Sequence, residues 1–413
     1  MHSCSIQNHI INIKLMFRNL LNLLVFKFTP VRRNRAVFTA YNGKCTDSPL
    51  YISQQLHAAA PHWHQTWLVL PQYRDKVPPY AEAVDYQSLH AQRRRGAAQV
   101  LVDNVYCDKS FTLFASTPHV KLKAALFRFF YHKPRQLAFT TFHGLPLKKL
   151  GRDQVGNDVQ GMVSDGVTML CPSRYQAETF RHLTFDTMKM VVLGSPRNDM
   201  LFTANRETVR AELGLPADKR ILLFAPSFRN DGHDVEGKNI RCSGLNQIEA
   251  LDFDRLTSSM SKRFGGEWVV AMRFHYHVAS MVDWEKLQRT TNGKILNANR
   301  CDDMEQYLVA VDALMSDVSS CMFDFLHTGR PTFVFFPDFE HYGSIERGLY
   351  LDMHSLPFPF AETPEQLYSN IEEFDSERFH EACATLLTSM GNVDDAHSAQ
   401  RAVDYILQQV VQK

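Results

Sequence analysis

The stretch VTMLCPSRYQAETFRHL, residues 167 to 183, decides the fold class. It opens on a short apolar run, Val167 to Cys171, which is typical of a strand buried in a sheet. Ser173 follows where a helix N-cap is expected, because its hydroxyl can accept a hydrogen bond from the first turn. The stretch therefore predicts a strand followed directly by a helix.

The same alternation of short apolar runs and helical patterns continues on both sides of this stretch. Such alternation predicts parallel sheets covered by helices, in two doubly wound α/β domains that face each other across a cleft. The other strands are expected within residues 35–43, 66–71, 99–106, 136–144 and 188–199, and in a second series within 221–228, 268–275, 294–299, 313–317 and 332–338. Gly329 is expected to end a helix as its C′ residue.

A chain of 413 residues also favours two domains, which we expect over residues 35–204 and 205–413. Residues 1–34 form a basic, apolar N-terminal segment without a signal-peptide cleavage site. Its run from Leu15 to Phe28 is too interrupted to span a bilayer but fits a helix lying on a membrane surface. A helix packed on the first domain fits equally well.

The distribution of charge and the spacing of the cysteines limit the functions that this sequence is expected to have. The net charge is only +1, but basic residues cluster in residues 1–40 and 120–153, which suggests a local anionic partner such as lipid headgroups or phosphate esters, not nucleic acid. Eight scattered cysteines indicate a reducing compartment. No Walker sequence and no Gly-x-Gly-x-x-Gly fingerprint is present, which argues against an ATPase and a dinucleotide oxidoreductase.

Polar side chains collect directly after the predicted strands, where ligands bind in such sheets. In the stretch TFHGLPLKKLGRD, residues 141 to 153, His143 borders a Gly-x-Pro turn and Lys148 and Lys149 follow. The lysines would lower the pKa of His143 and keep it neutral, so that it could act as a general base beside an anionic substrate.

The segment SDVSSCMFDF, residues 316 to 325, places Ser319 and Ser320 at the start of a helix, where backbone N–H groups favour phosphate. Asp324 lies on the same helical face and could accept hydrogen bonds from a ribose. A plain serine cap with an acidic first turn explains this segment better when it is taken alone.

Two other strand ends carry cations. Ser227 and Arg229 follow one predicted strand. Arg273 and His275 stand two residues apart at the end of the next strand, so their side chains share one face. Arg229 or Arg273 could bind a phosphate bidentately. Arg197 repeats the pattern in GSPRND, where a loop that leads into a helix cap is the simpler reading. His275 and His277 could bind zinc, but no third ligand is recognisable, so we expect no metal and no cofactor.

Six of these segments occur together in a known order. HGLPLKKLGRD, CPSRYQAETF, LGSPRND, FAPSFRND, RFH and the run from Ser316 to Asp352 resemble the motifs of the CDP-glycerol glycerophosphotransferase family, over residues 100 to 355. Leu145, Tyr276 and Val318 stand where the family commonly has Thr, Pro and Tyr, which leaves the donor and the acceptor length open.

The resemblance implies a GT-B architecture with two Rossmann-like domains. It implies transfer of a polyol phosphate from a CDP-linked donor to a hydroxyl of a lipid-linked or polymeric acceptor at the inner face of the cell membrane, with release of CMP, in teichoic acid or capsule synthesis. His143 matches the proposed base; Arg273 and His275 match the motif at the donor pyrophosphate; Ser319 and Ser320 match the phosphate-binding serines; and Arg347 lies in an Arg-Gly-aromatic segment.

Together with the residues above, this predicts a donor phosphate site of Ser227, Arg229, Arg273, Ser319, Ser320 and Arg347, with His143 and His275 catalytic and Lys148 and Arg197 on the acceptor side. Two other functions stay open. One is a GT-B glycosyltransferase or epimerase that uses a nucleotide sugar, and the other is a non-catalytic protein that docks on anionic polymer or lipid.

Overall fold

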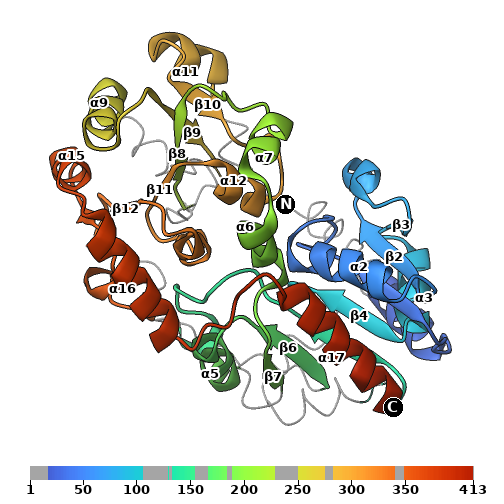
Figure 1. Cartoon of the computed structure of the whole chain (residues 1–413). Helices are drawn as coiled ribbons and strands as arrows, with labels where there is room; N and C mark the ends of the chain where they lie inside the picture. The colour runs from blue at the N-terminus through green and yellow to red at the C-terminus, as the bar shows by residue number, and fades with distance from the viewer. Residues whose placement is uncertain are drawn as a thin grey trace, which may run out of the picture. The chain divides into compact units, whose positions relative to one another are not determined.

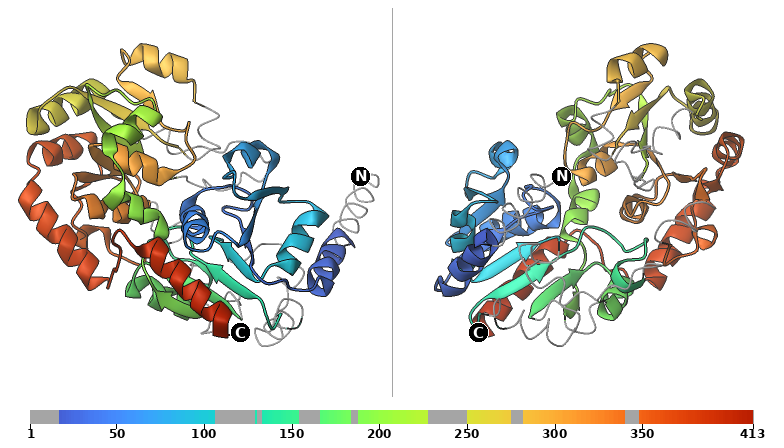
Figure 2. Two further views of the ribbon diagram at one scale, coloured as in Figure 1. Left: turned by 45° about the vertical axis from the view of Figure 1, so that its right-hand side comes forward. Right: turned by 180° about the vertical axis from the view of Figure 1, so that it is seen from behind.

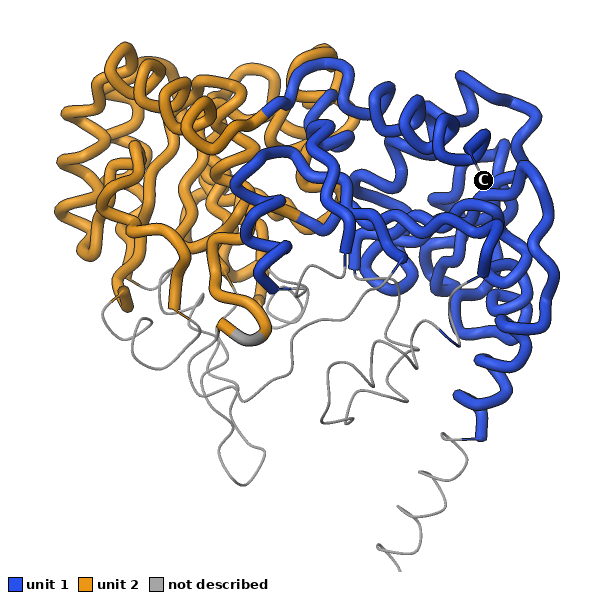
Figure 3. Tube along the Cα trace, turned by 90° about the horizontal axis from the view of Figure 1, so that it is seen from below, with its two compact units in different colours: residues 1–143, 158–199, 393–413 blue, residues 144–157, 200–392 orange. Residues whose placement is uncertain are grey.

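A computed structural model describes residues 17–105, 129, 133–153, 166–183, 188–227, 250–274, 282–339 and 348–412. The chain forms two compact units, and neither is continuous in sequence (Figure 3). Unit 1 comprises residues 1–143, 158–199 and 393–413, and unit 2 comprises residues 144–157 and 200–392. The expected boundary near residue 205 lies close to one of these crossings, but residues 144–157 and 393–413 each belong to the other unit.

Unit 1 contains a 7-stranded parallel sheet in the order β3-β2-β1-β4-β5-β6-β7 (Figure 1). The order reverses between β1 and β4, which is the switch point of a Rossmann-type sheet. Its strands are β1 (Arg35–Phe38), β2 (His64–Val69), β3 (Glu82–Asp85), β4 (Val100–Asp103), β5 (Leu137–Thr140), β6 (Val167–Cys171) and β7 (Lys189–Val192).

Helices cover both faces of this sheet because successive side chains of a strand point to opposite sides. Phe38, Trp67 and Val102 pack on one face with α2 (Asp47–Ala59) and α17 (Ser398–Gln412). Val37 and Leu68 pack on the other face with α3 (Leu89–Ala97), and Figure 2 shows the helices on both sides. Another helix of this unit, α5 (Arg174–Leu183), begins with the predicted cap, because Ser173 Oγ accepts from Gln176 N at 3.2 Å.

The helix α17 belongs to unit 1, and hydrogen bonds at its first turn hold it there. Asp199 accepts from the N–H groups of Ser398 and Ala399 at 2.9 and 2.8 Å, and Arg401 Nε donates to Leu193 O at 2.8 Å. These bonds satisfy the orphan donors of the helix N-terminus. The segment that follows β7 therefore holds the C-terminal helix on the sheet.

Residues 17–28 form a helix that packs on α3 through Leu23 and Phe26, which are 4% and 5% exposed. The buried Lys133 Nζ donates to Phe26 O at 2.7 Å and to Gly96 O at 2.8 Å. Burial and the charge of Lys27 lower the pKa of Lys133 to about 8. No helix of the described ranges is long and apolar enough to cross a bilayer.

Unit 2 contains a 6-stranded parallel sheet in the order β10-β9-β8-β11-β12-β13, which is the Rossmann order again. The α/β prediction is therefore confirmed, but it omitted the edge strands β3 and β13. The strands are β8 (Arg220–Ala225), β9 (Trp268–Met272), β10 (Ile295–Asn297), β11 (Ala313–Ser316), β12 (Thr332–Phe335) and β13 (Phe360–Ala361). The helices are α7 (Arg206–Glu212), α9 (Phe253–Phe264), α11 (Trp284–Thr290), α12 (Met304–Ala310), α13 (Cys321–Phe325), α15 (Pro364–Glu372) and α16 (Ser376–Ser389), and α6 (Asp199–Thr203) leads in from unit 1. Gly329 has φ +63°, as predicted for a helix end.

We predict that Gly194→Ala destabilises the protein by about 1–3 kcal/mol through strain and overpacking. Gly194 has φ +93°, and a Cβ there would lie 2.8 Å from Arg401 Nη2 and clash with the buried Ser398. The matched control is Gly214→Ala, where φ is +64° but no atom lies within 4 Å. Urea unfolding measures both; equal losses for the two variants would contradict the packing argument.

Candidate active site

Both switch points carry polar side chains at the carboxyl ends of the strands, where ligands bind in open parallel sheets. In unit 1, Tyr41 and Asp47 follow β1, Asn104 follows β4 and His143 follows β5. In unit 2, Ser227 follows β8 and Asp317 follows β11. Each cluster is described within its own unit.

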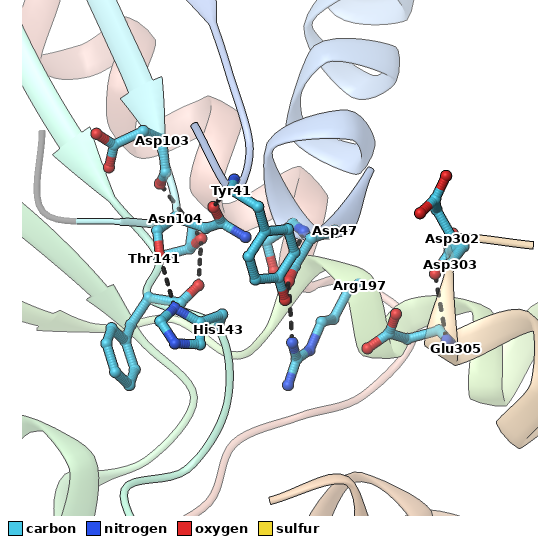
Figure 4. Close-up of polar contacts among 12 residues, drawn as sticks. Tyr41, Asp47, Asp103, Asn104, Thr141, His143, Arg197, Asp302, Asp303 and Glu305 are labelled. Carbon is cyan, nitrogen blue, oxygen red and sulfur yellow. Dashed lines mark hydrogen bonds and ion pairs between the residues drawn. The ribbon is translucent and has the colours of Figure 1, made fainter. Parts of the chain in front are cut away.

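His143 is held by the backbone of Asn104, as Figure 4 shows. Its Nδ1 lies 2.9 Å from the carbonyl oxygen of Asn104. A carbonyl can only accept, so this geometry requires the proton of the neutral ring to lie on Nδ1. The lone pair is then on Nε2, which has no hydrogen-bond partner in the described part of the chain. This is the tautomer that a general base needs.

Asp47 and Arg197 form a buried ion pair in the same unit (Figure 4). Arg197 Nη1 lies 3.1 Å from Asp47 Oδ2, and the side chains are 7% and 4% exposed. Tyr41 donates its hydroxyl to the same oxygen at 2.6 Å, while its backbone N–H donates to Asn104 Oδ1 at 2.8 Å. The ring of Tyr41 lies 5.5 Å from that of His143, centroid to centroid. Tyr41 thus connects the ion pair to the segment that holds the imidazole.

This environment keeps His143 neutral. Burial lowers the pKa of His143 and Arg197 lowers it further, whereas the Asn104 carbonyl and Asp47 raise it; the net pKa lies below 6.5. Burial raises the pKa of Asp47, but Arg197, Tyr41 and Ser48 outweigh that effect and hold it below 3.8. The lowered pKa of His143 agrees in direction with the expectation from the sequence, but its causes are burial and Arg197 instead of Lys148 and Lys149.

The backbone of this cluster is strained. Tyr41, Asn42, Asp47 and Phe142 all have positive φ, at +44°, +59°, +61° and +56°. Residues other than glycine adopt this region at a cost of about 1–3 kcal/mol each, and such residues concentrate at functional sites. Phe142 directly precedes His143, so its unusual turn sets the direction of the imidazole.

In unit 2, the backbone N–H of Ser227 donates to Asp317 Oδ1 at 2.9 Å, which joins the ends of β8 and β11. The predicted phosphate residues Ser227, Ser319 and Ser320 are thereby brought to one edge of the sheet and are partly exposed. Ser320 is the N-cap of α13, but its side chain makes no cap hydrogen bond.

Arg273 follows the neighbouring strand β9, yet its guanidinium is already used. It donates to the carbonyls of Ala298 and Cys301 at 2.9 and 2.6 Å, and to that of Asp302 at 2.9 Å. It also lies over the ring of Tyr307, 5.1 Å from the centroid. A phosphate would therefore have to share this guanidinium with the loop after β10.

The other predicted residues are distributed as follows. Asp324 is 8% exposed within α13, and Lys148 pairs with Leu349 in an antiparallel bridge of unit 2. Arg197, predicted for the acceptor side, is instead the partner of Asp47. The predicted residues Arg229, His275 and Arg347 lie outside the described residues.

In the described ranges, no three His, Cys, Asp or Glu side chains are arranged to hold a metal ion.

Comparison with known proteins identifies the family. Residues 21–408 match the family model described as CDP-glycerol:poly(glycerophosphate) glycerophosphotransferase. The chain belongs to this family. It is 28% identical to a teichoic acid poly(glycerol phosphate) polymerase of Staphylococcus epidermidis over 91% of its own length and 51% of that protein. It is 26% identical to such a polymerase of Bacillus subtilis, over 84% of its own length and 45% of that protein. The chain thus spans about half the length of these relatives.

A solved structure of the wall teichoic acid polymerase TagF has the same fold, with a TM-score of 0.74 at 23% identity. The match covers 98% of this chain and 97% of that one. The predicted GT-B type, with two Rossmann-like units, is therefore confirmed.

Sequence reasoning singled out His143 but did not include Tyr41, Asp47 and Asn104, which the structure places in the same polar cluster. Tyr41 lies three residues after β1 and Asn104 lies directly after β4, so position at a strand end was an available signal. Asp47 gave a weaker one, because an acidic residue in the first turn of a helix is common.

We predict that nuclear magnetic resonance titration gives His143 a pKa below 6.5, and that Asp47→Asn lowers it further. The carboxylate stabilises the imidazolium, so its loss favours the neutral ring. Breaking the buried pair also costs about 3–5 kcal/mol, so folding is checked by circular dichroism. The matched control is Asp75→Asn, an exposed carboxylate that should leave the titration unchanged. A higher pKa in Asp47→Asn would contradict the assigned electrostatics.

Proposed function

We propose that this chain transfers a polyol phosphate from a CDP-linked donor to the hydroxyl of a lipid-linked or polymeric acceptor. The acceptor oxygen forms a bond to the phosphorus that carries the polyol, and the bond from this phosphorus to the bridging oxygen of the diphosphate breaks. CMP leaves, and the hydroxyl proton goes to Nε2 of His143. The observation that carries the proposal is the Nδ1 bond of His143 to Asn104, which leaves Nε2 free to accept that proton.

The cationic and hydroxyl groups at the strand ends of unit 2 suit the donor. Ser227, Ser319 and Ser320 offer hydroxyls where β8 and β11 end, and we assign them to the donor phosphates. The buried Asp324 is assigned to the ribose, and Arg273, Arg229, His275 and Arg347 to the negative charge on the transferred phosphate and on the departing CMP. We assign Lys148 to the acceptor side. Arg197 is assigned an indirect role on the same side, because it pairs with Asp47 and lowers the pKa of His143.

The relatives support this reaction class and no sugar transfer. Both polymerases are named for poly(glycerol phosphate), and a TagF histidine variant was soaked with CDPG. Glycerol phosphate is therefore the first donor to test, and ribitol phosphate the second, since a ribitol-phosphate primase of Bacillus spizizenii is 26% identical over 56% of the chain.

We expect His143→Asn to reduce the rate of CMP release from CDP-glycerol by about 10²–10⁴-fold, the usual contribution of a general base. Donor affinity, measured by calorimetry, should stay within about twofold, because the imidazole acts on the acceptor proton. The matched control is His64→Asn, which removes a half-exposed imidazole beside Glu82 in unit 1.

Unchanged turnover in His143→Asn would exclude this residue as the base. Analysis of the product separates the alternatives, because a phosphodiester in the product requires phosphate transfer whereas a glycosyltransferase leaves a glycoside.

We also propose that the helix over residues 17–28 rests on an anionic membrane surface. Its outer face carries Phe17, Leu20, Leu21, Leu24 and Phe28, all at least 41% exposed and spaced three or four residues apart. Arg18, Arg32 and Arg33 are exposed beside or after it. An apolar face with basic flanks suits lipid headgroups and acyl chains. The inner face packs on α3, so the two alternatives of the sequence analysis are compatible.

We predict that the double variant Leu21→Gln and Leu24→Gln binds phosphatidylglycerol-containing vesicles about tenfold or more weakly in co-sedimentation. Two leucines then no longer enter the interface, and each buried leucine is worth about 1.5–3 kcal/mol. Val411→Gln is the matched control, since Val411 is 86% exposed on another helix. Equal vesicle binding by the double variant and by Val411→Gln would contradict the proposal that the outer face of this helix contacts the membrane.

A further inference from the structure

A cationic cavity of about 460 Å³ lies at the amino edge of the unit 2 sheet. Its walls come from the first residues of strands, or the residues just before them: Arg220 opens β8, Trp268 opens β9, Asp312 precedes β11 and Arg330 precedes β12. Arg206 and Arg210 of α7 complete it, and Figure 1 places α7 beside α12. The Ser227 and Asp317 cluster lies at the opposite, carboxyl ends of the same strands, so this cavity is separate from it.

Positive charge exceeds negative charge in this cavity. Five cationic side chains line it against the two carboxylates of Asp218 and Asp312. Asp312 is already saturated: its Oδ1 lies 2.6 Å from Arg206 Nη2, and its Oδ2 lies 3.2 Å from Arg210 Nη2 and accepts from Ile221 N at 2.8 Å.

Part of this charge has a structural use. Arg330 donates to Val309 O and Leu308 O at 3.0 and 2.7 Å, and Arg206 Nε donates to Ala310 O at 3.1 Å, so both arginines cap the carboxyl end of α12. Burial is the main reason that the pKa of Arg330 is lowered to about 10; the charges of Arg206 and Arg210 lower it further, and Asp312 opposes the shift.

Arg220 takes no part in the capping of α12. It is exposed, has no carboxylate partner in the described part of the chain, and lies over the ring of Trp268, 5.9 Å from the centroid. Lys219 beside it pairs with Glu267 at 2.7 Å. The buried Nε–H of Arg210 has no hydrogen-bond partner among the described residues. Capping of the carboxyl end of α12 therefore explains the positions of Arg206 and Arg330, but it does not explain the exposed guanidinium of Arg220.

We propose that this cavity is a second anion site, in which Arg220 and the Arg206–Arg330 group bind a phosphate ester. Guanidinium groups bind phosphate oxygens bidentately, and the volume falls within the range of about 300–1,000 Å³ typical of small-molecule sites. The guanidinium of Arg220 lies over the ring of Trp268, within the distance of a cation–π contact. The site requires no turnover and does not depend on the proposed transfer reaction.

The test is calorimetric titration of the whole protein with two probes, inorganic phosphate and a synthetic tri(glycerol phosphate), and no CMP is added because CMP is itself a phosphate ester that would compete for the cavity. Arg220→Gln should weaken binding of the probe by about tenfold, the loss expected for one charge-assisted hydrogen bond. Arg289→Gln is the matched control, because Arg289 is an exposed arginine on α11 away from the cavity wall. Raising the salt concentration should weaken binding further.

Binding of inorganic phosphate would identify free phosphate as a sufficient ligand, and binding of the tri(glycerol phosphate) alone would identify a phosphodiester chain. Equal isotherms for the wild type and Arg220→Gln, or no binding of either probe to the wild type, would overturn the proposal. Both variants should keep the wild-type thermal unfolding curve, since the side chain of Arg220 makes no hydrogen bond to any of the described residues. The result does not depend on whether His143→Asn abolishes transfer.

Discussion

The hydrogen bond from His143 Nδ1 to the carbonyl of Asn104 is the interaction on which the proposed transfer reaction depends. It determines which ring nitrogen can accept a proton, and it does so through a backbone atom whose position is set by β4. Asn104 is fixed in turn by the N–H of Tyr41, which follows β1. Two neighbouring strands at the switch point of the sheet thus set the tautomer of one imidazole.

The buried pair of Asp47 and Arg197 adjusts the charge around that ring. Its two members act on the pKa of His143 in opposite directions, and burial is the largest cause of the net lowering. A lone buried carboxylate would favour the protonated ring, and a lone guanidinium would cost several kcal/mol to bury. The positive φ angles of Tyr41 and Asp47 are consistent with a site in which backbone strain is tolerated to hold both groups.

Local sequence patterns predicted local structure well. The apolar runs gave most strands, Ser173 and Gly329 marked helix ends, and His143 was found because it follows a strand. The short edge strands β3 and β13 were missed because a strand paired on one side only needs no continuous apolar run. Asp47 was missed because its partner Arg197 lies 150 residues away, and no local pattern encodes that distance. The discontinuous units were missed for the same reason, since residues 393–413 carry no mark of the sheet to which they return.

The return of α17 to the first sheet has a consequence for how the protein is made. Ala402, Val403 and Ile406 are part of the same buried cluster as Phe38 and Trp67, although hundreds of residues separate them in the chain. A ribosome delivers α17 only after unit 2, so the nascent sheet waits with one face covered by α2 but not yet by α17 while the whole of unit 2 emerges. Chaperone shielding of that face during translation would then matter more for this protein than for one whose domains are completed one after the other.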